Sequence, residues 1–244
     1  VLSFATAHLG CTAGVMLTAS HNPKEYNGYK VYDSKGCQFC TEDAKGAIEC
    51  INAIEDYTSI PFEGKAENIT AVGEDVLSAF LAKVKEQSVY EEPSELKIVY
   101  TPLHGTGNIP VRRMLEGMNV TVVKEQEMPD GNFSTVRSPN PEEKDALNIA
   151  IEKVKAENID CHLIIGTDPD ADRVGVMTRT KDGSFITITG NQMGALLLDY
   201  VIKERKRKGT LPEYAYAVKS IVSTDMAYKI ARDNGVVLHE KDLA

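Results

Sequence analysis

Closely spaced carboxylates form the strongest chemical signal in the chain. The motif consists of Asp168, Asp170 and Asp172. It follows an apolar run at residues 163–165, and side chains at alternate positions just beyond a strand can converge on one cation. An all-carboxylate oxygen set favours Mg²⁺ over calcium or zinc. A solvated acidic turn is the simpler alternative, although adjacent carboxylates repel one another unless a cation or hydrogen bonds compensate. An EF-hand is excluded because Arg173 and Arg179 occupy the positions that need glycine and glutamate.

Ser20 is the second candidate, in a polar loop at residues 18–27 that follows an apolar segment. A serine in such a loop can act as an exposed nucleophile. His21 is its neighbour, but adjacent side chains seldom form a catalytic pair, and Ser, Asn and Pro also serve in ordinary turns. Lys30 lies ten positions further on and can face the loop if Tyr29 faces the core. Taken alone, this loop is a weak indication of catalysis.

The composition is that of an ordinary globular protein. The 244 residues are 42% hydrophobic and 26% charged, with a formal net charge of −9. This charge argues against a general nucleic-acid or membrane-surface partner, and no apolar run reaches the ~20 residues that span a bilayer. We expect a cytoplasmic protein. The sequence indicates no oligomeric state. Cys37 and Cys40 form a C-x-x-C, but no second pair completes a zinc site, and we interpret them as strand residues.

Three regions are predicted along the chain, at residues 1–93, 94–189 and 190–244, with a linker at residues 91–94. In the first region, an apolar segment at 14–17 and a hairpin of strands 29–32 and 37–39 precede helices at 42–55, capped by Thr41, and 75–88. One face of the second helix is expected to be apolar at Val76, Leu77, Phe80, Leu81 and Val84.

The second region alternates strands with helices. Strands are predicted at 96–100, 120–123, 162–166, 174–178 and 185–189, and helices at 111–117 and 142–157. The third region opens with a helix at 191–208, a strand at 215–221 and a further helix capped by Ser223 or Thr224, and it stops before a sheet is completed. This order predicts an α/β fold with mixed, mainly parallel sheets covered by helices.

Two stretches together resemble the α-D-phosphohexomutase superfamily, the phosphoglucomutases and phosphomannomutases. Residues 18–30, TASHNPKEYNGYK, are similar to that family's phosphoserine loop and its trailing lysine. Residues 166–173, GTDPDADR, look like its metal loop, commonly D-G-D-G-D-R, with Pro169 and Ala171 in place of the two glycines. Neither departure removes a ligand. Residues 100–107 (YTPLHGTG), 129–133 (PDGNF) and 138–142 (SPNPE) are similar to the phosphoglucomutase branch, which favours glucose or pentose phosphate over mannose phosphate.

The resemblance implies a mutase that moves a phosphoryl group between the 1- and 6-positions of a hexose phosphate through a sugar bisphosphate. Ser20 would carry the phosphate, which would ligate Mg²⁺ together with the three aspartates. Arg173 would stabilise the moving phosphoryl group, Lys30 would act as general acid/base, and His21 would hold the loop. The other expected phosphate-binding residues are Asn22 and Lys24.

Members of this superfamily have four domains around one cleft. The resemblance assigns residues 1–93 to the first domain with its phosphoserine loop, 94–189 to the second with its metal loop, and 190–244 to the start of the third. We therefore expect phosphohexomutase-type domains that are incomplete at both ends, and a chain that is inactive alone. The alternatives are a phosphopentomutase or phosphomannomutase, an inactive fragment with an interaction role, and a haloacid-dehalogenase-type phosphatase with Asp168 as nucleophile and Asp170 as acid/base. The phosphatase does not explain the Ser20 loop.

Overall fold

A computed structural model of the chain describes residues 1–89 and 94–241. The chain divides into two compact units, Val1–Glu86 and Gln87–Ala244, and each is described by itself. The predicted linker falls largely on residues 91–93, which lie outside the described residues. Within the described ranges, no helix combines the length and the apolar character that crossing a membrane requires.

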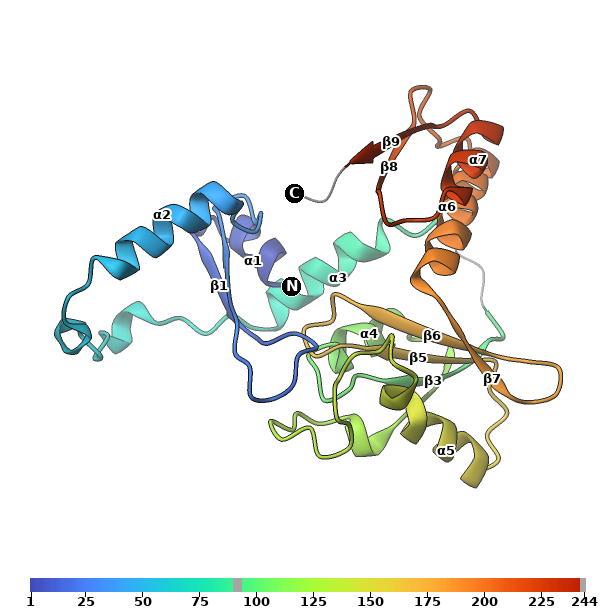
Figure 1. The fold of residues 1–244 in the computed structure, drawn as a ribbon, viewed down its shortest axis with the longest axis horizontal. Helices are drawn as coiled ribbons and strands as arrows, with labels where there is room; N and C mark the ends of the chain where they lie inside the picture. Colours follow the sequence, from blue (N-terminus) through green and yellow to red (C-terminus); the bar gives the residue numbers. More distant parts are fainter. Residues whose placement is uncertain (90–93, 242–244) are drawn as a thin grey trace. The chain divides into compact units, whose positions relative to one another are not determined.

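A two-stranded antiparallel sheet and three helices make up the first unit (Figure 1). Its elements are α1 Leu2–His8, β1 Gly14–Leu17, β2 Tyr29–Tyr32, α2 Thr41–Asn52, short 3-10 turns at Tyr57–Ser59 and Ala66–Asn68, and α3 Glu74–Lys85. The predicted return strand at 37–39 is wrong, because a single bridge between Tyr32 and Gln38 replaces it. The Asp33 carboxylate accepts the backbone N–H groups of Lys35 and Cys37, so it satisfies the turn locally.

The two long helices of this unit are shorter than predicted. Cys40, and not Thr41, occupies the N-cap of α2, whose last residue is Asn52. Of the predicted apolar face of α3, Val76 is buried, whereas Val84 is 38% exposed. The spacing of apolar residues therefore locates both helices, but it does not show how deeply each side chain is covered.

A five-stranded mixed sheet forms the centre of the second unit, in the order β4-β3-β5-β6-β7. The strands are β3 Lys97–Thr101, β4 Asn119–Val122, β5 Leu163–Thr167, β6 Val174–Arg179 and β7 Phe185–Ile188. β3 is parallel to both β4 and β5, whereas β6 and β7 are antiparallel to their neighbours. Because β3 and β5 are parallel neighbours, the loops that follow them emerge at the same edge of the sheet.

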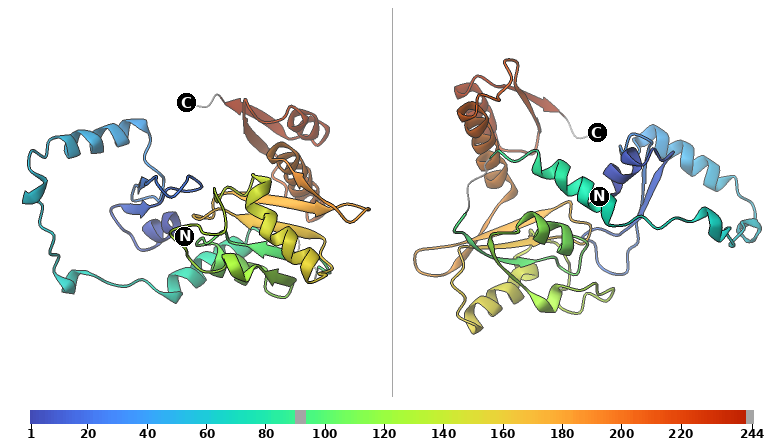
Figure 2. Two further views of the ribbon diagram at one scale, coloured as in Figure 1. Left: turned by 60° about the horizontal axis from the view of Figure 1, so that its bottom comes forward. Right: turned by 180° about the vertical axis from the view of Figure 1, so that it is seen from behind.

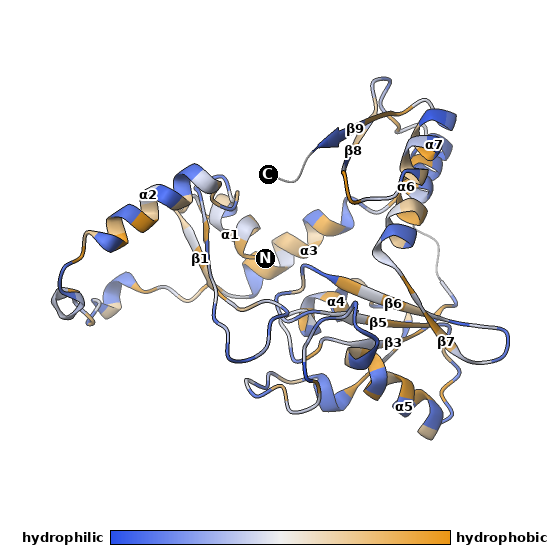
Figure 3. Cartoon of the chain, in the orientation of Figure 1, coloured by the Kyte–Doolittle hydropathy of each residue, from blue (hydrophilic) through white to orange (hydrophobic). Residues whose placement is uncertain are grey.

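Helices and 3-10 turns connect these strands. They are α4 Asn108–Met114, turns at Lys124–Gln126 and Lys144–Leu147, and α5 Asn148–Ala156. Ala150 and Val154 of α5 join a buried cluster with Val99, Ile164 and Met177 of the sheet. Figures 1 and 2 show α5 lying along the sheet, and Figure 3 shows hydrophobic and hydrophilic residues alternating along this helix. The helix buries its apolar side as an amphipathic helix must.

Two helices and two strands follow the sheet. Its elements are α6 Gly190–Arg207, β8 Tyr216–Ser220, α7 Met226–Asp233 and β9 Val237–Lys241. Thr189 and Gln192 form a reciprocal capping box at the start of α6. Asp225, and neither Ser223 nor Thr224, precedes α7 at its N-cap. β9 was not predicted: it pairs with β8 in parallel and completes a two-stranded sheet.

Candidate active site

A hydrogen-bonded turn carries the three aspartates out of the end of β5. The Ala171 N–H donates to the Asp168 carbonyl at 3.0 Å, which places Pro169 at the second position of the turn, where its fixed φ is suitable. Ala171 has a φ of 59°, in the left-handed region that glycine normally occupies. The two departures from the family motif therefore act differently, since proline suits the turn and alanine is strained in it.

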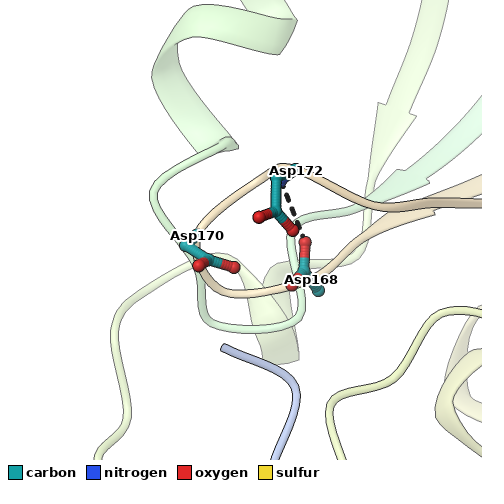
Figure 4. A group of neighbouring side chains, drawn as sticks. All are labelled: Asp168, Asp170 and Asp172. Atoms are coloured by element: carbon teal, nitrogen blue, oxygen red, sulfur yellow. Dashed lines mark hydrogen bonds between the residues drawn. The ribbon is translucent and has the colours of Figure 1, made fainter. Parts of the chain in front are cut away.

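The carboxylates of this loop, which we call the metal loop (residues 168–172), turn toward one another (Figure 4). Ligand atoms of Asp168, Asp170 and Asp172 all lie within 4.8 Å of one another. Asp168 is fully buried, Asp170 is half-buried and Asp172 is exposed. Such a set of oxygen ligands, open on one side, fits a hard divalent cation. The predicted convergence of the three side chains is thus present in the structure.

Asp168 is the anchor of the metal loop. Its Oδ1 accepts the backbone N–H groups of Asp172 at 3.1 Å and Arg173 at 2.9 Å. Burial raises the pKa of Asp168 to about 6, the carboxylates of Asp170 and Asp172 add to the rise, and the Arg173 N–H opposes it. A bound cation would relieve this like-charge repulsion, because an opposite charge favours the ionised carboxylate. The residues present therefore fit a metal ion.

Arg173 directly follows the metal loop, and its side chain is 40% exposed. A guanidinium nitrogen lies 3.9 Å from Oε1 of Glu142, the last residue of the SPNPE segment at 138–142. At this distance and exposure the ion pair is weak. Arg173 can accordingly reorient toward an incoming anion at low energetic cost.

Ser20 lies in the first unit, in the loop between β1 and β2, with a φ of 54°. Its N–H donates to Thr18 Oγ1 at 2.9 Å, and the Asn22 N–H donates to the Ala19 carbonyl. The Ser20 hydroxyl lies 3.2 Å from His21 Nδ1, so the adjacent pair is within hydrogen-bond distance. A left-handed residue other than glycine costs energy and tends to mark a functional turn.

The remaining candidates of the first unit lie on the same loop or on β2. Asn22 and Lys24 are exposed in the loop, and Lys30 is half-buried on β2 opposite Met16 of β1. Tyr29 is 65% exposed, so the condition that it faces the core is not met. Because successive strand residues face opposite sides of a sheet, Lys30 lies on the other face of β2 from the exposed Tyr29. Ser20 and the metal loop belong to different units.

One group of residues at the metal loop was not predicted to act there. The loop at residues 102–107, which we call the β3 loop, touches the metal loop through Gly105 and Thr106. The sequence does show a glycine-rich loop after a predicted strand. Only the order of strands in the sheet shows that this strand lies beside, and parallel to, the strand that carries the aspartates.

Two family models match the chain. They describe phosphoglucomutase/phosphomannomutase alpha/beta/alpha domain I, at residues 1–58, and domain II, at residues 78–183. The phosphoglucomutase of Staphylococcus aureus (strain USA300) is 37% identical over 245 aligned residues, which cover 98% of this chain and 43% of that protein. The chain thus spans less than half the length of this curated relative.

Solved structures agree on the fold. A phosphoglucomutase/phosphomannomutase family protein of Burkholderia thailandensis gives a TM-score of 0.69 at 22% identity, covering 96% of this chain and 46% of that one. The N-acetylphosphoglucosamine mutase of Aspergillus fumigatus, solved with GlcNAc-6P and magnesium, gives 0.65 at 15% identity, covering 98% and 57%. The expected α/β fold is confirmed, and these relatives give no support to a haloacid-dehalogenase-type phosphatase. This chain belongs to the phosphoglucomutase/phosphomannomutase family of the α-D-phosphohexomutase superfamily.

Proposed function

We propose that this chain supplies the phosphate-carrying serine and the metal site of a phosphohexomutase, which moves a phosphoryl group between the 1- and 6-positions of a hexose phosphate. The convergence of Asp168, Asp170 and Asp172 within 4.8 Å carries the proposal. Glucose phosphate is the preferred substrate, since the curated relative is a phosphoglucomutase. The pentose and mannose phosphates stay as the alternatives within the family.

Magnesium is the proposed metal ion. Oxygen-only ligation by carboxylates is typical of Mg²⁺, and the Aspergillus relative was solved with magnesium. When bound, the ion would neutralise the charge that develops on a transferring phosphoryl group. The three aspartates would hold it, and the phosphate on Ser20 is the proposed further oxygen ligand.

The protein's own residues have separate proposed roles. Ser20 Oγ accepts and returns the phosphoryl group from a loop position with a left-handed backbone. His21, within 3.2 Å of that oxygen, holds the hydroxyl, while Asn22 and Lys24 contribute to binding phosphate. Arg173 pairs with the moving phosphoryl group in exchange for its weak contact with Glu142. Lys30 transfers the proton of the sugar hydroxyl.

Sugar phosphates and sugar bisphosphates are the proposed partners. One structure of the Aspergillus mutase contains GlcNAc-6P, and a serine-to-alanine variant of that mutase was solved with glucose 1,6-bisphosphate. A bisphosphate is the expected intermediate of a mutase, because the serine must give up one phosphoryl group before it takes the other.

The phosphoenzyme provides the test. The chain would be incubated with ³²P-labelled glucose 1,6-bisphosphate and Mg²⁺, and the label located by mass spectrometry and by its stability in acid. We expect an acid-stable phosphoserine at Ser20, lost in Ser20→Ala and retained in Ser34→Ala, an exposed serine of the same unit. A labile acyl-phosphate on Asp168 would instead establish the phosphatase, and a chain that takes no label would contradict the proposed role of Ser20.

A further inference from the structure

The β3 loop is held in a conformation that needs support from its surroundings. Leu103 and His104 have φ values of 47° and 62°, and left-handed residues other than glycine persist where neighbouring contacts fix them. The His104 N–H donates to the Gln126 carbonyl at 2.9 Å. The ring nitrogens of His104 lie 2.8 Å from the Met128 carbonyl oxygen and 2.7 Å from Thr135 Oγ1. The β3 loop is therefore fixed by contacts with residues 126–135.

From this fixed loop, Thr106 reaches the metal loop. Its backbone N–H donates to the Pro169 carbonyl oxygen at 2.8 Å, and its Oγ1 donates to the same oxygen at 3.0 Å. Pro169 stands between Asp168 and Asp170, so its carbonyl sets the orientation of the peptide that leads into Asp170. Two hydrogen bonds to one carbonyl oxygen restrict that peptide more than one bond would.

Close packing reinforces these bonds. A Cβ added at Gly105 would lie 2.5 Å from Pro169 Cα and 2.7 Å from the Pro169 oxygen, so the two backbones touch directly. Tyr100 Oη and Thr167 Oγ1 lie 2.9 Å apart and tie the end of β3 to the residue before Asp168. The metal loop thus packs against the β3 loop at Pro169, and the strands that lead into the two loops are bonded to each other.

We propose that Thr106 is a positioning residue for the metal loop, and that its side-chain hydroxyl raises the affinity of the three aspartates for a divalent cation. The inference rests on the proposed metal site. Carboxylates bind a cation tightly only when they converge before it arrives, and groups that orient ligands typically change metal affinity 10–100-fold. Thr106 is not among the proposed metal ligands, and its effect would act through the Pro169 carbonyl.

Mn²⁺ is a suitable probe, because its EPR signal falls on binding and carboxylate sites accept it. The Kd of Mn²⁺ would be measured for the full chain and for Thr106→Val, which keeps the backbone bond and loses the hydroxyl. We expect Mn²⁺ to bind Thr106→Val about tenfold more weakly and Thr106→Ser like the wild type. Thr70→Val, at an exposed loop threonine of the first unit, is the matched control.

Unfolding in EDTA separates positioning from simple stability. Thr106 is exposed, so the melting temperature of metal-free Thr106→Val should match that of the wild type. If the valine variant does not fold, Thr106→Ala carries the same expectation. Equal Mn²⁺ affinity in the wild type and in the variant that lacks the hydroxyl would overturn the role of Thr106 and leave the metal site standing. A wild-type chain that binds no Mn²⁺ would overturn both.

Discussion

At the scale of single residues, Asp168 is a charge that the metal-free fold disfavours. The folded chain holds its pKa at about 6, above the ordinary 3.8, because the carboxyl group is buried among other carboxylates. The fold therefore disfavours the ionised form. The cost is absent below pH 3.8, grows as the pH rises to about 6 and is constant above.

Asp168→Asn should remove that cost in the metal-free chain. The amide oxygen can still accept the N–H groups of Asp172 and Arg173. In EDTA, we expect the free energy of unfolding of the variant to rise relative to the wild type between about pH 4 and pH 6, the interval between the two pKa values. With excess Mg²⁺ at neutral pH, the order should reverse, since only the wild type gains binding energy. Urea unfolding followed by circular dichroism measures both, and a pH-independent difference in EDTA would contradict the raised pKa.

The residue scale also shows where prediction from sequence ends. The three aspartates lie at alternate positions within five residues, so their spacing predicts their convergence. The contact between Thr106 and Pro169 joins residues 63 positions apart and depends on β3 and β5 being neighbours. Ala171 in a left-handed conformation is likewise invisible in the sequence, since alanine does not mark such a position as glycine does. The link between Ser20 and the aspartates came from the resemblance alone.

At the scale of elements, the bounds of strands and helices were predicted accurately where particular residues mark their ends. β5 and α6 lie within one residue of their expected bounds, because glycine and threonine mark their ends and their apolar residues are continuous or periodic. α1 was missed because it has seven residues and no side-chain cap. β9 was missed because strand pairing, and not composition, stabilises a segment that ends in charged residues.

Gly175 of β6 provides a test of how the sheet holds the segment that precedes α5. A Cβ there would collide with the Pro141 carbonyl oxygen and lie 2.6 Å from its carbon. Gly175→Ala should therefore displace the segment and destabilise the chain by about 1–3 kcal/mol. Gly194→Ala is the matched control, because this glycine is exposed within α6 with nothing near its Cβ position, and alanine should stabilise the helix by roughly 0.5–1 kcal/mol. Urea unfolding of both variants should give opposite signs, and a shared sign would refute the packing at Pro141.

At the scale of the whole molecule, charge is the dominant constraint. The chain has a net charge of −9. In the proposed site, a phosphoserine brings about −2, the three aspartates −3, magnesium +2, and Lys30 with Arg173 another +2, which leaves about −1. When the sugar bisphosphate is present, the serine has given up its phosphate, so the site carries about +1 against roughly −4 on the ligand, a sum of about −3. Holding such a ligand through its reorientation therefore requires more cations than the candidates described in this chain supply.

This charge balance predicts that taking up a phosphoryl group and completing turnover are separable in these 244 residues. Transfer to Ser20 needs the serine and the metal site, whereas turnover needs the bisphosphate to be retained while it reorients. We expect the chain to form phosphoserine from glucose 1,6-bisphosphate, yet to convert glucose 1-phosphate no faster than Ser20→Ala does. A coupled assay with glucose-6-phosphate dehydrogenase measures the conversion. Turnover that disappears in Ser20→Ala would show that the cations of this chain suffice to hold the intermediate.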